Sequence, residues 1–520
     1  MDCYGKCQRE VYVDDKCILH CIKNDYQKER NSGLLSSFYN EFIIYTIAQL
    51  FEHTELLDDK YSKDEITTYL KSDRFGNDEY NEALKKSIFI PSCIHFPKRN
   101  GRDTFDYLKI LNLFGQIHFN CCEFYLSSLD LDNVECFFQD CKFHGRWTLY
   151  DYRVFENEDN VIYQTCEFDK TVSNYIPEQS DKLSTYRYSQ FDYTCQFKKN
   201  IEFDRCNFTN RLFNTNQNNY LEKNEIEKMI IENCIFEQKF KLNNYHIQYL
   251  ECKNTIFKNK FEFKENILTS FIVDNSNFSG LSDFFGCNFS TFKVHKSIFD
   301  DFVGFETCIF GTDKKSKDKI AQFKYVTFTN FLNFRNTQFK SGLDIENINL
   351  KEAPNFLNSK IELYNTNRET FRILKYSFDK IGNNIEANKY FVKEMKKYRE
   401  ELSKKPLKGH IQEKIVFNLN DIFSDFGQSY LKPILLLFIF AFLYMLVLYG
   451  YEENILYKIY KPMNIYIQPV VDVINHMTKN ILPFGKFLKN DLEFVSLIFY
   501  IIFSTLIWQT IVSIKRYTKR

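Results

Sequence analysis

The chain of 520 residues has little glycine, little proline and no excess of either charge. With 16 glycines and 9 prolines, glycine-rich loops that cradle phosphate have little raw material. The 68 basic residues equal the 68 acidic ones, which argues against a general nucleic-acid binder and against a strongly acidic mimic of DNA. The 9 histidines are scattered, and no H-E-x-x-H, G-x-S-x-G or P-loop motif occurs. We therefore expect a protein that is not an enzyme and that does not bind nucleic acid.

The chain is not poor in cysteine, but most of its 16 cysteines follow a pattern that is not that of a disulfide framework. The N-terminus is polar, so we expect no signal peptide there. Nine cysteines stand two residues before a phenylalanine, namely Cys122, Cys136, Cys141, Cys166, Cys195, Cys206, Cys234, Cys287 and Cys308. Buried free cysteine behaves as a small hydrophobic residue, so we expect reduced thiols in a cytoplasmic compartment.

The N-terminal segment, 1–30, carries a separate cysteine cluster. Cys3, Cys7, Cys17 and Cys21 form two C-x3-C pairs on either side of a short charged loop. Two such pairs can close a tetrahedral zinc site, which would stabilise a segment with too little apolar surface for a core. The usual knuckle spacing is C-x2-C, so unliganded thiols or redox chemistry remain alternatives, as does His20 in place of Cys21. One structural zinc ion is the only cofactor that the sequence predicts.

Large apolar residues recur between positions 226 and 310 in repeated steps of 5, 5, 6 and 5, so the same pattern returns once in every four steps. One column of the pattern contains Phe236, Phe257, Phe278 and Phe299; a second, two positions earlier, contains Cys234, Thr255, Ser276 and Ser297; a third contains Asn233, Asn254 and Asn275. Neither the helical period of 3.6 nor the strand period of 2 fits. The four steps together give a period of about 21 residues, which indicates a repeat architecture in which each unit buries its apolar face against its neighbours.

Four apolar anchors in each period predict four faces of about five residues, with the anchor and the small residue before it both pointing inward. This pattern resembles the pentapeptide-repeat family of bacterial proteins, in which a central Leu or Phe follows a small residue at minus two. The resemblance implies a right-handed quadrilateral β-helix, a β-solenoid. Phenylalanine dominates the centre here, and Phe240, Phe261, Phe271 and Phe292 fill minus-two positions on other faces. The bore is therefore expected to be filled by aromatic rings.

The composition divides the chain into five expected regions. They are the cysteine cluster at 1–30, an α-rich N-terminal cap at 31–115, a β-helix of roughly eight coils at 116–364, a helical hairpin and linker at 365–430, and a transmembrane hairpin at 431–520. Polar insertions at 144–162, 169–191 and 209–225 interrupt the repeat. Insertions in solenoids emerge as loops on one face, where they either bind a partner or are tolerated without a function.

Residues 433–450 and 494–514 are almost wholly apolar and long enough to span a bilayer. Basic residues flank both outer ends, namely Lys404, Lys405, Lys408, Lys414 and Lys432 before the first span and Lys515, Arg516, Lys519 and Arg520 after the second. This distribution predicts a multi-pass inner-membrane protein with both termini and the β-helix in the cytoplasm. Residues 424–429 resemble the segment that joins pentapeptide repeats to membrane helices in some bacterial proteins, and we expect a polar turn there.

These features predict a membrane-anchored scaffold that displays a rigid β-helix to a protein partner. The alternative is a channel or transport component formed by a homo-oligomer of hairpins. No acidic residue lies inside either span and the loop between them carries no selectivity filter, which disfavours this alternative. A further alternative comes from the family resemblance, because some soluble pentapeptide-repeat proteins imitate DNA and bind topoisomerase. The neutral charge and the membrane tether count against it.

Overall fold

The computed structural model describes most of the chain, in two compact units. The described residues are 12, 16–23, 32–53, 62–72, 79–98, 105–131, 133–153, 161–176, 182–214, 224–406, 408–453, 469–476 and 488–518. The first unit is Met1–Thr366 and the second is Asn367–Arg520.

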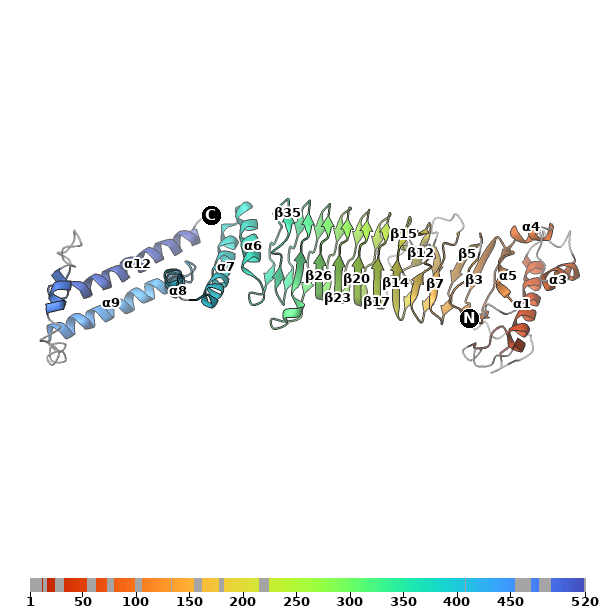
Figure 1. Ribbon diagram of the computed structural model, residues 1–520, viewed down its shortest axis with the longest axis horizontal. Helices are drawn as coiled ribbons and strands as arrows, with labels where there is room; N and C mark the ends of the chain where they lie inside the picture. Colours follow the sequence, from red (N-terminus) through yellow and green to blue (C-terminus); the bar gives the residue numbers. More distant parts are fainter. Residues whose placement is uncertain are drawn as a thin grey trace. The chain divides into compact units, whose positions relative to one another are not determined.

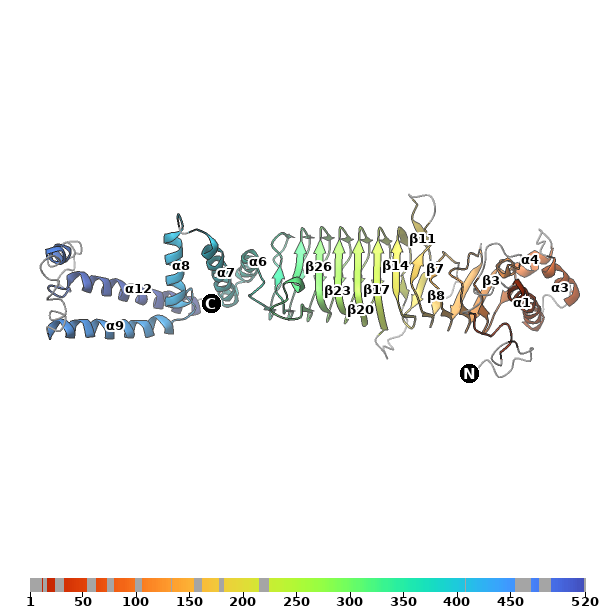
Figure 2. The same cartoon turned by 60° about the horizontal axis from the view of Figure 1, so that its bottom comes forward.

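The first unit is a stack of short strands that form five sheets (Figure 1, Figure 2). A six-stranded sheet contains β1 (Ile88–Phe89), β3 (Gln116–Asn120), β5 (Glu135–Gln139), β8 (Val161–Gln164), β12 (Ser189–Asp192) and β16 (Phe213–Asn214). A five-stranded sheet contains β2 (His95–Phe96), β4 (Glu123–Phe124), β6 (Lys142–Phe143), β9 (Glu167–Phe168) and β13 (Gln196–Phe197). A second five-stranded sheet contains β19 (Phe240–Lys241), β22 (Phe261–Glu262), β25 (Ser282–Asp283), β28 (Val303–Gly304) and β32 (Leu332–Asn333).

The two remaining sheets run along the rest of the stack. An eight-stranded sheet contains β11 (Ser184–Tyr186), β15 (Cys206–Phe208), β18 (Ile235–Phe236), β21 (Ile256–Phe257), β24 (Asn277–Phe278), β27 (Ile298–Phe299), β31 (Thr327–Phe328) and β35 (Asn349–Leu350). A twelve-stranded sheet contains β7 (Trp147–Leu149), β10 (Val172–Asn174), β14 (Asn200–Asp204), β17 (Asn224–Glu232), β20 (Tyr245–Lys253), β23 (Ile267–Asp274), β26 (Asn288–His295), β29 (Ile309–Phe310), β30 (Ala321–Lys324), β33 (Gln338–Phe339), β34 (Leu343–Asp344) and β36 (Lys360–Ile361).

The strand register confirms the period predicted from the apolar residues. Strands β17, β20 and β23 pair in parallel, so Ile226 lies beside Ile247 and Ile247 beside Leu268. The result is a parallel β-solenoid of about 10 turns, more than the roughly eight expected. The difference has two sources: the first coil already begins at β1 (Ile88–Phe89), ahead of residue 116, and the insertions obscure the spacing of the coils that follow.

Phenylalanine rings stack along the interior of the solenoid. In the predicted column, ring centroids lie 4.9 Å apart between Phe236 and Phe257, 4.8 Å between Phe257 and Phe278, and 4.5 Å between Phe278 and Phe299. These separations match the distance between hydrogen-bonded strands, because one ring is supplied by each coil. Phe261, from a neighbouring face, meets Phe278 edge-on at 5.1 Å. The expected aromatic interior is thus confirmed.

Many core phenylalanines have a small residue two positions earlier, and several of these small residues also donate a hydrogen bond. All nine cysteines of the C-x-F pattern are buried. The Cys287 thiol donates to the Phe263 carbonyl of the preceding coil at 2.9 Å, and the Cys308 thiol donates to that of Phe284 at 2.8 Å. The Thr255 hydroxyl does the same toward Ile231 at 3.3 Å. A short side chain with a donor therefore satisfies a buried carbonyl between coils.

The asparagine column forms a ladder at a corner of the coils. Asn275 Nδ2 donates to Asn254 Oδ1 at 2.8 Å, Asn254 donates to Asn233 at 3.0 Å, and Asn233 donates to Asp204 at 2.8 Å. Residues Asn275, Asn254 and Asn233 have φ values of 46°, 51° and 54°, in the left-handed region. Asparagine is among the residues that tolerate this conformation best. It therefore suits the corner both through its backbone conformation and through the hydrogen bonds of its side chain.

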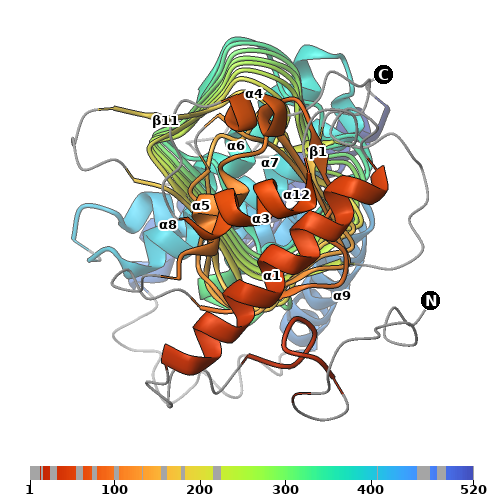
Figure 3. The same ribbon diagram turned by 90° about the vertical axis from the view of Figure 1, so that its right-hand side faces the viewer.

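Helices lie at the N-terminal end of the solenoid. The helices α1 (Ser32–His53), α3 (Lys63–Lys71) and α4 (Glu79–Lys85) precede β1, and α5 (Tyr107–Leu111) lies between β2 and β3. Phe42 of α1 meets Phe89 and Phe96 of the first strands edge-on, at 6.0 and 5.7 Å between ring centroids. Figure 3 shows α1 lying across this end of the stack. At the far end, the charged insertion after Phe310 contains one 3-10 turn, η2 (Lys317–Lys319).

The second unit is helical. It contains α6 (Arg368–Lys380), α7 (Asn384–Lys404), α8 (Ile411–Ser424), α9 (Leu431–Glu452) and α12 (Glu493–Thr518). Two segments, Leu431–Glu452 and Glu493–Arg516, are long and apolar enough to cross a membrane by length and composition. Their side chains are mostly exposed to the surroundings, with 6% and 11% of the apolar windows buried.

The turn between α8 and α9 is less polar than expected. Asp425, Phe426 and Gly427 have φ values of 49°, 54° and 83°, so three consecutive residues are left-handed. The Phe426 side chain is buried, and its carbonyl accepts a hydrogen bond from Arg516 near the end of α12. A cation that engages this carbonyl helps to hold a backbone conformation that is unfavourable for non-glycine residues.

Candidate functional site

Titratable side chains of successive coils contact one another on the outer surface of the sheet formed by β2, β4, β6, β9 and β13. Each of these strands ends with an inward phenylalanine, so the residue that follows it points outward. In four successive coils that outward residue is Tyr125, His144, Asp169 and Lys198. Glu123, on β4, projects from the same face. We call Glu123, His144, Asp169 and Lys198 the His144 stripe.

His144 lies between two carboxylates that come from different coils. Its Nε2 atom is 2.8 Å from Glu123 Oε2, and its Nδ1 atom is 2.8 Å from Asp169 Oδ2. When both ring nitrogens face carboxylate oxygens, both must donate, so the geometry favours the imidazolium form. Tyr125 stacks on the imidazole at 4.4 Å between ring centroids and donates its hydroxyl proton to Glu123 Oε2 at 3.1 Å. Lys198 Nζ then reaches Asp169 Oδ1 at 2.8 Å.

The pKa values follow from these contacts. Partial burial disfavours the charged form of His144, but the hydrogen bonds and charges of Glu123 and Asp169 together outweigh burial and raise its pKa. Burial also opposes ionisation of Glu123, yet its pKa falls to about 2 because His144 donates to it and His95 and His144 lie nearby. Both shifts favour the ion-paired form of Glu123 and His144.

His95 behaves differently although it lies on the same face. Burial lowers its pKa to about 4, more than the nearby Glu123 carboxylate raises it. Its Nε2 atom is 3.6 Å from Glu123 Oε1, and its side chain is 1% exposed. At neutral pH His95 is thus neutral, whereas the contacts of His144 favour its charged form as the partner of Glu123.

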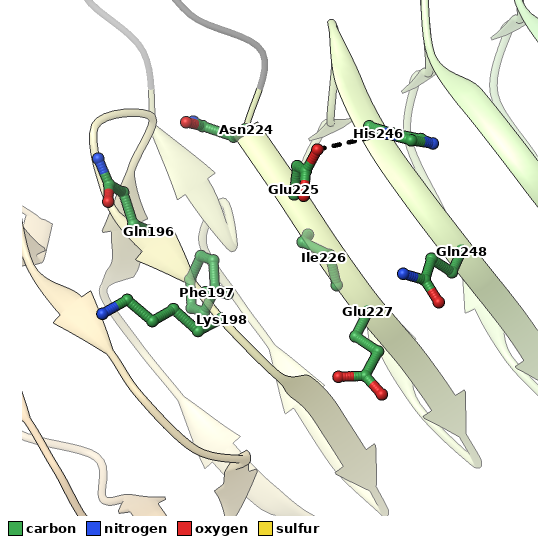
Figure 4. Close-up of a pocket in the computed structure, with 9 residues that line it drawn as sticks. All are labelled: Gln196, Phe197, Lys198, Asn224, Glu225, Ile226, Glu227, His246 and Gln248. Carbon is green, nitrogen blue, oxygen red and sulfur yellow. Dashed lines mark ion pairs between the residues drawn. The ribbon is translucent and has the colours of Figure 1, made fainter.

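The stripe leads into a surface hollow of about 370 Å³. It opens between β13, which ends its sheet, and β17 (Figure 4). The lining residues are Gln196, Phe197, Lys198, Asn224, Glu225, Ile226, Glu227, His246 and Gln248. Glu225 Oε1 and His246 Nδ1 form an ion pair at 3.5 Å, and Lys199 Nζ pairs with Glu227 Oε2 at 2.6 Å. The hollow is mainly polar and large enough for a side chain or a small polar group.

The predicted zinc ligands are only half described. Cys3 and Cys7 lie outside the described residues, while Cys17 and Cys21 are buried. Cys17 Sγ is 3.2 Å from His20 Nδ1, and Cys21 Sγ accepts a hydrogen bond from the buried Lys23 ammonium at 3.0 Å. In the described part of the chain no group of three or more His, Cys, Asp or Glu side chains is arranged to hold a metal ion. Zinc at these cysteines stays a prediction.

The His144 stripe was not found from the sequence, although a signal was present. Cys122, Cys141, Cys166 and Cys195 each begin a C-x-F triplet. Aligning these triplets, which the strand pairing places side by side, would have put Tyr125, His144, Asp169 and Lys198 in one column. The spacings between the triplets differ because the insertions are unequal, so a search for a fixed period does not reveal the column.

The described architecture defines a class: a parallel β-solenoid with helices at both ends and two helices that are apolar enough to cross a membrane. Comparisons with protein-family profiles, with curated proteins and with solved structures gave no match.

Proposed function

We propose that this chain is a membrane-anchored pentapeptide-repeat protein that serves as a cytoplasmic scaffold and binds a protein partner through its solenoid. The observation that carries this proposal is the His144 stripe, in which carboxylate, imidazolium, carboxylate and ammonium groups follow one another across successive coils. A partner of complementary charge would meet this alternating pattern without having to order it first, because the groups are already held by one another.

Several features support the pentapeptide-repeat assignment and its quadrilateral form. The backbone register repeats from Ile226 to Ile247 to Leu268, and this spacing allows four short sides in each coil. A small residue stands two positions before the phenylalanines of the Phe236 column, and corner residues such as Asn254 and Asn275 turn the chain in the left-handed region. Coils built in this way stack into a rigid rod, since each coil packs against the next over its full cross-section.

Recognition fits the stripe better than catalysis. The carboxylates of Glu123 and Asp169 are both engaged by His144, so a catalytic base would first have to break these bonds. The lowered pKa of Glu123 and the lowered pKa of Asp169 also make them weak bases at neutral pH. The proposed protein is therefore a binding protein and not an enzyme.

The two apolar helices support the anchor. Lys432 lies at the start of one helix, and Lys515 and Arg516 lie at the end of the other. Positive charges at these ends support a hairpin in the inner membrane with both termini and the solenoid in the cytoplasm. A permeation path remains the alternative use of such a hairpin. Ion flux through vesicles that contain the purified chain distinguishes the two, because the scaffold should leak no faster than empty vesicles do.

Crosslinking in native membranes followed by affinity purification tests the scaffold. We compare the wild type with the double variant H144Q/D169N, which removes the two central charges and keeps their size. K258A is the matched control, because Lys258 also follows a core phenylalanine and pairs with a carboxylate of the neighbouring coil, Glu237, at 2.8 Å. The proposal expects a partner that is captured by wild type and K258A and lost from the double variant. Identical capture by all three proteins would refute a role of the stripe.

A further inference from the structure

Helix α8 (Ile411–Ser424) carries an exposed apolar face. Its members are Ile411, Ile415, Val416, Leu419 and Ile422, which are between 41% and 58% exposed. At 100° per residue these side chains occupy an arc of about 140° around the helix axis. A surface helix of a soluble protein normally turns such a stripe toward a core. We call these five residues the α8 apolar face.

The opposite face of α8 is held by other helices of the second unit. Phe417 packs edge-on against Tyr398 of α7 at 4.9 Å, and Asp421 forms an ion pair with Arg399 of α7. Toward α12, Gln509 donates to Asn420 Oδ1 at 2.9 Å. The Ser424 hydroxyl donates to Gln509 Oε1 at 2.8 Å. Because these contacts hold the opposite side of α8, the α8 apolar face is directed away from α7.

The contacts with α12 also fix the position of α8 along the length of α12. Gln509 and Arg516 are seven residues apart, which corresponds to about 10 Å along a helix. The end of α8 lies between them, since Ser424 bonds to Gln509 and Phe426, just beyond α8, bonds to Arg516. Figure 2 shows α8 running across the direction of α9 and α12. Interfacial helices lie in the membrane plane about 5–10 Å into the boundary between headgroups and acyl chains.

The charges around α8 agree with a lipid surface. Between residues 402 and 425 the chain has four lysines, at 404, 405, 408 and 414, and three acidic residues, Glu413, Asp421 and Asp425. Asp421 and Asp425 are paired with Arg399 and Lys396 of α7, whereas the four lysines lie outside the core of the unit. Lysines close to an anionic leaflet are attracted to it.

We infer that α8 is an interfacial helix whose apolar face inserts into the membrane surface beside the two spanning helices. The inference rests on the proposed membrane anchor, because lipid reaches α8 only if α9 and α12 span the bilayer. Insertion would bury the α8 apolar face, and it would place Gln509, a polar residue within an apolar helix, against its partners Asn420 and Ser424 at the edge of the hydrocarbon.

Tryptophan quenching in vesicles tests this assignment with the full chain. The protein has 2 tryptophans: Trp147 is buried in the solenoid, and Trp508 on α12 is 63% exposed. The variant I415W places a third tryptophan on the α8 apolar face. The matched control E413W places it about 200° away around the same helix. Each protein is reconstituted in vesicles of phosphatidylcholine and phosphatidylglycerol, with and without bromine atoms along the acyl chains, which quench nearby tryptophans.

The quenchable share of the emission separates the outcomes. With Trp508 in reach of lipid and Trp147 out of reach, the share is about one-half in the wild type. Insertion of α8 raises it to about two-thirds in I415W, whereas E413W falls to about one-third. If Trp508 is quenched while I415W and E413W give the same share, the inference fails and the anchor stands. If Trp508 is not quenched in the wild type, both the anchor and the inference fail.

Discussion

Replacing Phe278 by alanine should open the solenoid locally. Phe278 is fully buried, stacks on Phe257 and Phe299 at 4.8 and 4.5 Å, and meets Phe261 edge-on at 5.1 Å. Phenylalanine-to-alanine changes in protein cores cost about 3–5 kcal/mol. Because three aromatic contacts are lost, we expect a value near the upper end, about 4–5 kcal/mol. Leucine, the usual central residue of the resembling family, should cost less at this position, about 1–2 kcal/mol.

Hydrogen exchange followed by mass spectrometry measures this loss in the full chain in detergent micelles. Since about 1.4 kcal/mol corresponds to a tenfold change, amides of β21, β24 and β27 should exchange about a thousand-fold faster in F278A. Amides of β3 and β5 should keep their rates, because each coil packs only against its neighbours. F285A is the matched control, since Phe285 is 40% exposed and should cost less than about 1 kcal/mol. Equal acceleration in F278A and F285A would refute an interior held by stacked rings.

Three further predictions concern the His144 stripe, the asparagine ladder and the cysteine cluster. Because the folded state raises the pKa of His144, its ion pair stabilises the fold fully below the unfolded pKa of about 6.5, and this stabilisation is lost as the pH rises through the folded pKa. The variant H144Q should therefore lower the thermal midpoint more at about pH 5.5 than at about pH 8.5. An equal loss at both pH values would contradict this. N254A should destabilise the solenoid by about 1 kcal/mol more than N254G, because alanine tolerates the left-handed region less well than glycine does. Chemical denaturation measures the free energy of unfolding of both variants, and equal losses would contradict the backbone argument. Elemental analysis should find about one zinc per wild-type chain and less in a variant with Cys3 and Cys17 changed to serine, whereas equal zinc in both would defeat the metal proposal.

The sequence was most informative where the repeat is uninterrupted. From residue 226 to residue 310, the spacing of large apolar residues predicted the register, and the paired strands confirm it. The burial of the cysteines before phenylalanine was also predictable, because a small residue must share the crowded interior with each ring. Where insertions break the count, the number of coils was underestimated, since unequal loops hide the phase of the repeat.

The sequence by itself determined the solenoid, because a period set by side-chain volume leaves the backbone few ways to bury so many rings. It also identified two segments apolar enough to cross a membrane, since this depends on length and composition alone. Only the tertiary structure decided that His144 stands between Glu123 and Asp169, which are 21 and 25 residues away along the chain. It also decided that α8 has one face held by Arg399 and Gln509 and another left open. These contacts join residues at spacings set by loops and helix packing, which obey no period that a single sequence can display.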